Sequence, residues 1–575
     1  MNLKLDKKSI LSWLDENILL ILSSFLLAFI PLWPKIPLFS LIEQYIVRVR
    51  AEDIFIALTG VIWLIQVYRR KIKWQTPIFY AVLFYGFISL LSLLNAMFVL
   101  HTIPLQLLHV GKSSLHFFRY LEYFSLLFIL YSSIKNKRDL LIASSMIALT
   151  VIGVAIYGYG QKYFYWPVYS TMNREFSKGV RLYLTEHARV QSTFAGHYDL
   201  GGYLAISLPF LYSFFLAVKT KKLKALYALG FIMGLWILII SASRGAFGSF
   251  LIGTAAVLGL YTLAQQGWIK KIWYGFKHGL LLIFITGFML INYGEDMNER
   301  FLQILAAYPA AHETYHYFNG KRKEGLKVLL LALIGKEELK AELPAGAVPL
   351  PTPALTTGVA LTPTDTVPVP VRPTDVYVEV PDKVAVATQA ADGTFTIIYE
   401  ERERVFSDCA IKKSLSLCIR LEALWPMAIN SLKQSPILGK GYATLNKEGN
   451  YQFTEADGTD NNYLRILGET GFLGFLSFFG IIGLSCYYAL KHLASQDALK
   501  HAASIAIIAC SLGLLTDAVY IDVFAASKVA YSYWAIIGLS LAYLKLPELE
   551  LVKLPAISKK KSNSRHSGPS RKTRK

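Results

Sequence analysis

The chain has 575 residues, of which 54% are hydrophobic, 14% aromatic and only 17% charged. The apolar residues gather in runs longer than a water-soluble core requires, which predicts a polytopic membrane protein and excludes a soluble globular enzyme. The net charge of +20 does not indicate a nucleic-acid site, because Lys and Arg lie in short clusters between apolar runs and in the tail.

Twelve apolar segments are each close to the ~20 residues that a helix needs to cross a bilayer, and several are somewhat shorter. The pattern predicts an all-α polytopic membrane protein with about twelve transmembrane helices. The predicted spans are residues 18–33, 53–67, 77–94, 119–134, 140–157, 200–218, 225–241, 246–264, 279–291, 471–490, 502–519 and 529–544. The first span lacks a small-residue cleavage site, so we expect an anchor and not a removed signal peptide.

Basic clusters fall in alternate loops between these spans. They lie at residues 4–8, 69–73, 135–138, 219–224, 270–277 and 491–500, and in the tail from 559 onward. Because cytoplasmic loops carry an excess of Lys and Arg, these loops and both termini are predicted to face the cytoplasm. The other loops then face outward from the cytoplasmic membrane.

The spans divide the chain into four parts. Residues 1–291 hold helices 1 to 9, 292–470 form a large extracytoplasmic loop, 471–545 hold helices 10 to 12, and 546–575 form a basic cytoplasmic tail. Residues 343–382 of the loop are rich in Pro, Val and Thr, which predicts a flexible insertion.

Two further elements are expected in the large loop. Residues 393–400 favour a short strand, and residues 410–432 favour an amphipathic helix. Pro426 should kink or break that helix, because proline has no N–H to donate.

A polar stretch leads directly into the tenth span. Residues 459–474 carry Asp460, Asn461, Tyr463 and Glu469. Polar groups at the mouth of a membrane helix are costly, so this stretch is a candidate functional site. The alternative is an interfacial helix cap, in which Asp460 accepts backbone N–H groups and Tyr463 anchors the helix among lipid headgroups.

Two arginines are candidate anion ligands. Arg244 lies in the short turn between the seventh and eighth spans, and Arg420 lies in the amphipathic segment of the large loop. A guanidinium has a fork that matches phosphate or carboxylate geometry. The alternatives are a snorkelling side chain for Arg244 and a solvated helix face for Arg420.

The order of these motifs resembles the O-antigen ligase and polymerase family. The resemblance covers roughly residues 189–474 and extends to the twelve-span layout. Its motifs are Arg189-Val190-Gln191-Ser192-Thr193-Phe194, Ser243-Arg244-Gly245, Arg420 with Trp425, Pro436-Ile437-Leu438-Gly439-Lys440-Gly441, Asp460-Asn461-Asn462-Tyr463-Leu464 and Glu469-Thr470-Gly471-Phe472-Leu473-Gly474.

The resemblance implies a GT-C-like membrane glycosyltransferase that uses no metal or other cofactor. It would move a glycan from an undecaprenyl-pyrophosphate carrier to an acceptor hydroxyl on a glycan, lipid or protein, at the outer face of the inner membrane. Arg244 and Arg420 would hold the pyrophosphate, and two fixed guanidiniums stabilise charge on such a leaving group. The remaining substrate contacts would come from Arg189, Asn461, Tyr463 and Glu469. Direct attack by the acceptor inverts the anomeric carbon.

The catalytic base has two candidates. Ligases of this family commonly show His-Asn-x-Tyr-Leu, where this chain has Asp460 in the first position. A carboxylate is a weaker base than imidazole unless burial changes its proton affinity. His197, at the outer end of the sixth span, is the second candidate.

Three other functions are alternatives to a glycan ligase. His312-Glu313-Thr314-Tyr315-His316 matches the zinc-protease pattern, but nearby Pro309 and Gly320 leave a short helix and no third ligand is evident. A transporter of lipid-linked sugars should show internal repeats, which are not found. A polysaccharide polymerase would use the same donor with a second carrier-linked glycan as acceptor.

Asp517, Asp522 and Lys528 lie near the outer end of the last hairpin. In a transporter they would form the ion site, but we expect them to form an ion-paired support for the catalytic face. The polar-loop pair Cys409 and Cys418 would form a disulfide if the loop faces an oxidising compartment.

Overall fold

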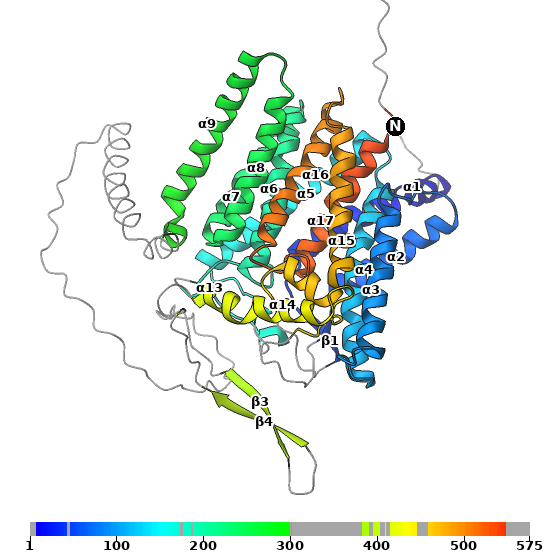
Figure 1. Ribbon diagram of the computed structural model, residues 1–575. Coiled ribbons are helices and arrows are strands. Elements are labelled where there is room, and N and C mark those ends of the chain that lie inside the picture. Colours follow the sequence, from blue (N-terminus) through cyan, green and yellow to red (C-terminus); the bar gives the residue numbers. More distant parts are fainter. Residues whose placement is uncertain are drawn as a thin grey trace, which may run out of the picture.

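The computed structural model describes residues 7–42, 47–172, 176–185, 188–298, 301, 382–389, 395–402, 409, 415–445 and 458–547. Within these residues the protein is an all-α bundle with two small β-hairpins (Figure 1). The long helices are α1 (Lys7–Leu32), α2 (Ala51–Tyr68), α3 (Phe79–Phe98), α4 (Leu107–Ser133), α5 (Lys137–Tyr163), α6 (His197–Ala217), α7 (Lys221–Ile240), α8 (Arg244–Leu263), α9 (Trp268–Tyr293), α15 (Asn462–Lys491), α16 (Ala498–Asp517) and α17 (Ser527–Lys545).

Each of the twelve predicted spans overlaps one of these helices. In the described part of the chain, 10 helices are long and apolar enough to cross a membrane. The two predicted spans outside that set lie in α4 and α17. Their sequences carry more polar groups, since α4 contains Lys112, Arg119 and Glu122, and α17 has Lys528 and Lys545 at its ends. The protein is therefore multi-pass with ten candidate spans, and the number twelve stays a prediction.

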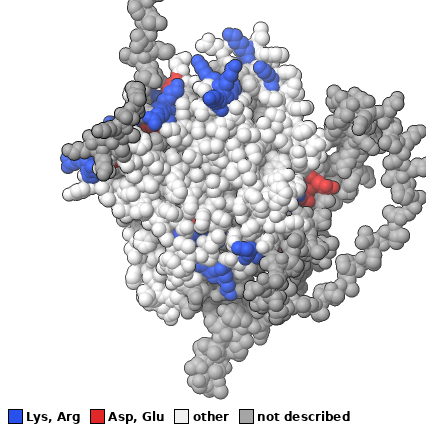
Figure 2. All heavy atoms as spheres, turned by 180° about the vertical axis from the view of Figure 1, so that it is seen from behind, with Lys and Arg blue, Asp and Glu red and all other residues white. Residues whose placement is uncertain are grey.

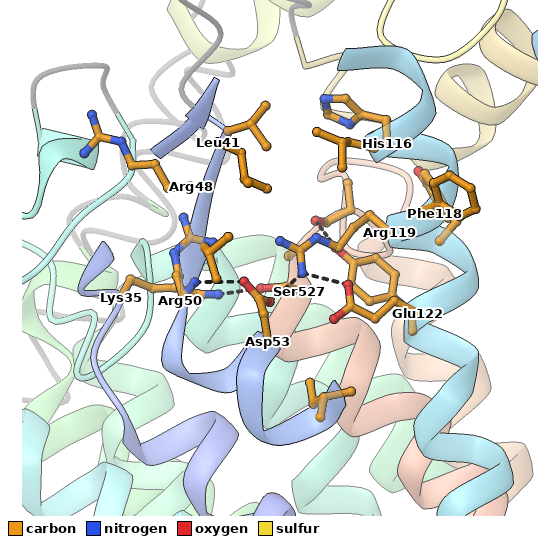
Figure 3. A pocket seen from close by; sticks show the side chains of 18 of the residues that line it. Lys35, Leu41, Arg48, Arg50, Asp53, His116, Phe118, Arg119, Glu122 and Ser527 are labelled. Atoms are coloured by element: carbon orange, nitrogen blue, oxygen red, sulfur yellow. Dashed lines mark hydrogen bonds and ion pairs between the residues drawn. The ribbon is translucent and has the colours of Figure 1, made fainter. Parts of the chain in front are cut away.

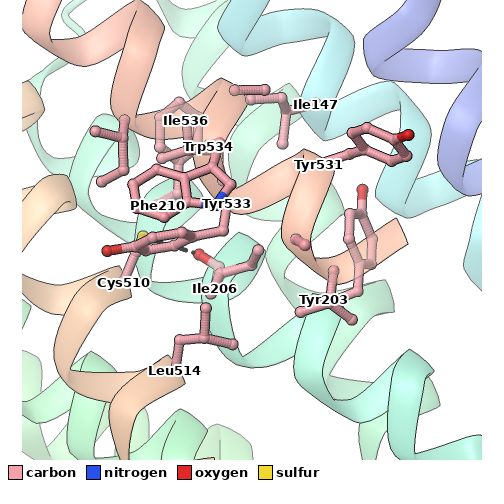
Figure 4. Packing of buried hydrophobic residues seen from close by; sticks show 14 of the residues in the cluster. Ile147, Tyr203, Ile206, Phe210, Cys510, Leu514, Tyr531, Tyr533, Trp534 and Ile536 are labelled. Carbon is pink, nitrogen blue, oxygen red and sulfur yellow. Dashed lines mark hydrogen bonds between the residues drawn. The ribbon is translucent and has the colours of Figure 1, made fainter. Parts of the chain in front are cut away.

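The centre of the bundle is formed by α6, α16 and α17, which are buried over most of their length. Figure 4 shows Ile206 and Phe210 of α6 facing Cys510 of α16 and the Tyr533 ring of α17. In contrast, α9 lies at the edge of the bundle and has no buried residue (Figure 1).

The two ends of the bundle differ in charge and structure. Exposed Lys and Arg residues of the loops at 69–73, 135–138 and 219–224 gather at one end (Figure 2). The opposite end carries the strands β1 (Pro37–Ile42) and β2 (Val47–Arg50), and the helices α13 (Leu415–Ile419) and α14 (Trp425–Gln434). We refer to it as the hairpin end.

The expected elements of the large loop are found where the structure describes it. The strand predicted at 393–400 corresponds to β4 (Phe395–Arg402), which pairs antiparallel with β3 (Asp382–Gln389). Most of the predicted insertion at 343–382 and the zinc-protease pattern at 312–316 lie outside the described residues.

The predicted amphipathic helix is interrupted close to Pro426. A π-helical turn, η2 (Arg420–Leu424), separates α13 from α14, and the N–H of Trp425 donates to the carbonyl of Arg420. Pro426 occupies the first turn of α14, where its missing N–H costs little. Cys418 of α13 forms a disulfide with Cys409, as expected for a loop in an oxidising compartment. The interruption places Arg420 at a break in the helix.

Candidate functional site

Glycines allow two of the sequence motifs to pack backbone against backbone. Gly439 (φ +70°) and Gly471 (φ +66°) both adopt left-handed conformations that side chains rarely allow. A Cβ on Gly471 would lie 2.4 Å from the carbonyl carbon of Ile437. The N–H groups of Gly441 and Phe472 donate to the carbonyls of Glu469 (2.9 Å) and Pro436 (2.8 Å). The segment at 436–441 is thus fixed against a kink in α15, and we call this contact the glycine clasp.

Asp522 organises the polar stretch before α15. Its carboxylate accepts hydrogen bonds from the N–H and hydroxyl of Thr459 (3.0 and 2.8 Å), and from the N–H of Asn461 (3.1 Å). It also forms an ion pair with Arg465 at 3.0 Å. We call Thr459, Asn461, Arg465 and Asp522 the Asp522 cluster. Four donors on one carboxylate fix the backbone of this loop.

Asp460 points away from this cluster and meets Arg420. Its φ of +49° lies in the left-handed region, which Asp tolerates better than most residues. Its Oδ2 lies 3.0 Å from Nη2 of Arg420, which also donates to the carbonyl of Tyr520 at 3.1 Å. Arg420 is buried, whereas the Asp460 side chain is 42% exposed. The structure therefore brings together two of the predicted catalytic residues.

The three predicted substrate-binding residues of this stretch have internal partners. The side chain of Asn461 caps α15 by accepting the N–H of Leu464. The Tyr463 hydroxyl donates to the carbonyl of Leu515 (2.8 Å), and its ring stacks on Phe479. Buried Glu469 accepts the N–H of Ala443. The helix cap is thus Asn461 and not Asp460, and Tyr463 is tied to α16. Substrate contacts by these residues stay a prediction.

The other predicted residues lie at the start of α6 and α8. A guanidinium N–H of Arg189 donates to Nε2 of buried His197, because arginine has no acceptor atom. This contact uses the lone pair that a catalytic base would need. Arg244 is the first residue of α8, half-buried, and is positioned by the Ser241–Ser243 turn.

Of the expected ion-paired support, only Asp522 forms the ion pair. Both oxygens of Asp517, on α16, are buried and lack a hydrogen-bond partner among the described residues. Lys528 donates to the carbonyls of Pro31, Trp33 and Thr193 and so joins α17 to the end of α1. The prediction was wrong for these two residues: backbone carbonyls take the place of a carboxylate partner for Lys528, and Asp517 has no basic partner among the described residues.

A cavity of about 780 Å³ lies between α2, α4 and the β1–β2 hairpin. Figure 3 shows Lys35, Arg48 and Arg50 on one side of it, and His116, Arg119 and Glu122 on the other. Five basic side chains (Lys35, Arg48, Arg50, Arg119, Arg465) and three acidic ones (Asp53, Glu122, Asp199) line the cavity. This excess of positive charge favours an anionic ligand.

The basic side chains of the cavity are held by specific contacts. Arg119 pairs with Asp53 (2.6 Å) and Glu122 (2.9 Å), and Lys35 pairs with buried Glu52 (2.8 Å). Burial lowers the pKa of Lys35, and the Glu52 carboxylate opposes that shift. The Nε atoms of Arg48 and Arg50 are buried without a partner among the described residues. Unsatisfied buried donors are costly unless a ligand or water completes them.

The lining of the cavity changes from polar to apolar along α2. Arg50 and Asp53 lie near the first turn of α2, and Ile56, Ala57 and Gly60 continue the lining further along it. The ten steps along the helix from Arg50 to Gly60 correspond to about 15 Å. Such a cavity suits an amphiphile with an anionic headgroup and an apolar chain.

This cavity was not predicted from the sequence. None of the predicted site residues Arg189, His197, Arg244, Arg420 and Asp460 is among those that line it. A signal was present: Arg48, Arg50 and Arg119 are basic residues at the predicted outward ends of spans, where the positive-inside rule does not place them.

Comparison with known proteins relates one segment of the chain to a family. No curated protein matches the chain. Residues 383–479 match the family model described as O-antigen ligase, Wzy_C. The matched segment contains Arg420, Asp460, the glycine clasp and Arg465 of the cavity wall. The protein is therefore a membrane protein with ten candidate spans among its described residues, and its residues 383–479 are similar to the O-antigen ligase family.

Proposed function

We propose that the protein transfers a glycan from an undecaprenyl-pyrophosphate carrier to an acceptor hydroxyl at the outer face of the inner membrane. The observation that carries this proposal is the cavity, which has a cationic end and an apolar end. A lipid diphosphate needs a cationic region for its phosphates and an apolar region for its chain in the same cavity. The O-antigen ligase segment supports the same reaction, because its Arg465 lines the cavity.

Charge stabilisation is the main contribution of the basic residues to this reaction. The diphosphate gains negative charge as its bond to the sugar breaks, and fixed guanidiniums stabilise that charge. Arg420 is held by Asp460 and the Tyr520 carbonyl, so it is already oriented before substrate binds. The family motifs lead us to propose Arg244 and Arg420, which lie outside the lining of the cavity, as further diphosphate ligands at the hairpin end, with no metal required, and inversion at the anomeric carbon.

The proposed orientation places the hairpin end on the extracytoplasmic side of the inner membrane. The exposed basic loops lie at the opposite end (Figure 2), and such loops face the cytoplasm. Both termini are then cytoplasmic. The Cys409–Cys418 disulfide supports this orientation, because disulfides persist in oxidising compartments.

Reconstitution tests the proposal directly. Purified protein in liposomes is given a polyprenyl-diphosphate glycan, with and without an acceptor and with and without EDTA. Transfer should require both substrates and survive EDTA, and product length separates ligation from polymerisation. Donor that crosses the bilayer without any transfer would instead indicate a transporter.

Arginine variants test the assigned roles in the same assay. Arg420→Ala should lower transfer by at least about 100-fold, because one preorganised donor to a developing anion contributes that much. Arg420→Lys keeps the positive charge but loses the forked guanidinium, so its transfer rate should lie between those of the wild type and Arg420→Ala. Arg244→Ala should behave like Arg420→Ala. Folded variants with unchanged turnover would remove either arginine from the mechanism.

A further inference from the structure

The acidic side chains of the cavity are not equivalent. Asp53 and Glu122 both form ion pairs with Arg119. Asp199, in the first turn of α6, lines the same cavity and makes no hydrogen bond or ion pair with any described residue. Among the described carboxylates that line the cavity, Asp199 therefore has lone pairs available to a bound molecule.

The charged residues that the structure describes around Asp199 do not form hydrogen bonds with its oxygens. Lys35 and Lys528 are near enough to interact electrostatically with it, but both donate elsewhere, to Glu52 and to backbone carbonyls. One turn further along α6, the carboxylate of Asp517 lies 3.3 Å from where a Cβ of Gly202 would be. Another carboxylate thus closes off the inner side of this turn, and the cavity is the accessible side.

The two bases expected from the sequence are both engaged by arginines. Asp460 is ion-paired with Arg420, and Nε2 of His197 accepts from Arg189. A general base must have a lone pair within hydrogen-bond reach of the proton that it removes. Asp199 meets this requirement inside the cavity that suits the lipid-linked donor.

We propose that Asp199 is the proton acceptor of the transfer reaction, an inference that rests on the proposed function. The acceptor oxygen forms its bond to the anomeric carbon while the carbon–oxygen bond to the diphosphate breaks. The hydroxyl proton moves to the Asp199 carboxylate, and the diphosphate leaves with the electron pair of the broken bond. The proton then passes from Asp199 to water, which restores the carboxylate.

Chemical rescue tests this role. Asp199→Ala should lower transfer by about 10²–10⁴-fold, the usual contribution of a general base. Formate, a small carboxylate that fits the space left by the side chain, should restore a measurable part of the rate with the normal glycan product. Asp199→Asn keeps the shape of the side chain and should be as inactive as the alanine variant, with donor binding retained.

The matched control is Glu122→Ala, which removes a carboxylate of the same cavity that is already paired with Arg119. Any loss in this variant should not be rescued by formate. If Asp199→Ala and Asp199→Asn keep wild-type rates, or if formate fails to rescue a folded Asp199→Ala, the inference is overturned. A wild-type protein that transfers nothing to any acceptor would instead overturn the proposed function.

Discussion

The cavity and the Asp522 cluster both place charged side chains at the hairpin end, but they use them differently. In the Asp522 cluster every oxygen of the central carboxylate is occupied by donors of the protein itself. In the cavity, Arg48 and Arg50 keep unpartnered Nε atoms and Asp199 keeps free oxygens among the described residues. The Asp522 cluster thus supports the fold, and further substrate contacts are expected from the side chains of the cavity that have no partner in the described part of the protein.

The largest effect is expected from breaking the Asp522 cluster. Asp522→Ala removes the carboxylate that Thr459, Asn461 and half-buried Arg465 share. Removing one partner of a buried ion pair costs about 3–5 kcal/mol, and the longer 3.6 Å ion pair of Arg465 with Glu469 offsets part of that cost. We expect a large loss of thermal stability and of folded protein in detergent. Asp15→Ala, at an exposed ion pair with Arg69, is the control and should change stability little.

The glycine clasp should give the next largest effect. Gly471→Ala forces a side chain into a left-handed conformation and against the backbone of Ile437, which costs about 1–3 kcal/mol or more. Gly480→Ala, on the same helix with nothing within 4 Å of the added carbon, should be neutral or slightly stabilising. Equal melting temperatures for these two variants would contradict the close packing of the clasp.

A smaller and purely functional effect is expected in the cavity. Arg50→Gln removes one positive charge while Arg119 keeps both of its carboxylate partners. Loss of one charge-assisted contact should weaken donor binding about tenfold, equivalent to ~1.4 kcal/mol. Titration of the polyprenyl-diphosphate glycan against protein in nanodiscs measures this. A less stable Arg50→Gln variant with unchanged donor affinity would show that Arg50 supports the fold and does not bind the donor.

The sequence predicted the all-α membrane fold because long apolar runs leave few alternatives to helices in a bilayer. It also identified Arg420 and Asp460, which the structure brings to 3.0 Å. It did not identify the cavity, because Lys35, Arg50, Arg119 and Asp199 come from four separate segments. Their proximity depends on helix packing, which periodicity does not encode. The internal role of Glu469 was missed for the same reason, since its partner Ala443 lies in a separate segment. The cap formed by Asn461 is local, and the sequence pattern assigned it to the neighbouring Asp460.

The central position of α17 also bears on how the protein is made. This helix is the last long helix that the structure describes, yet it is buried along almost its whole length, and Lys528 near its start holds the end of α1. Translation makes α1 before α17, so the earlier helices enter the bilayer before their central partner exists. The interior can therefore close only after α17 has been made, and a nascent chain stopped before residue 527 cannot complete it.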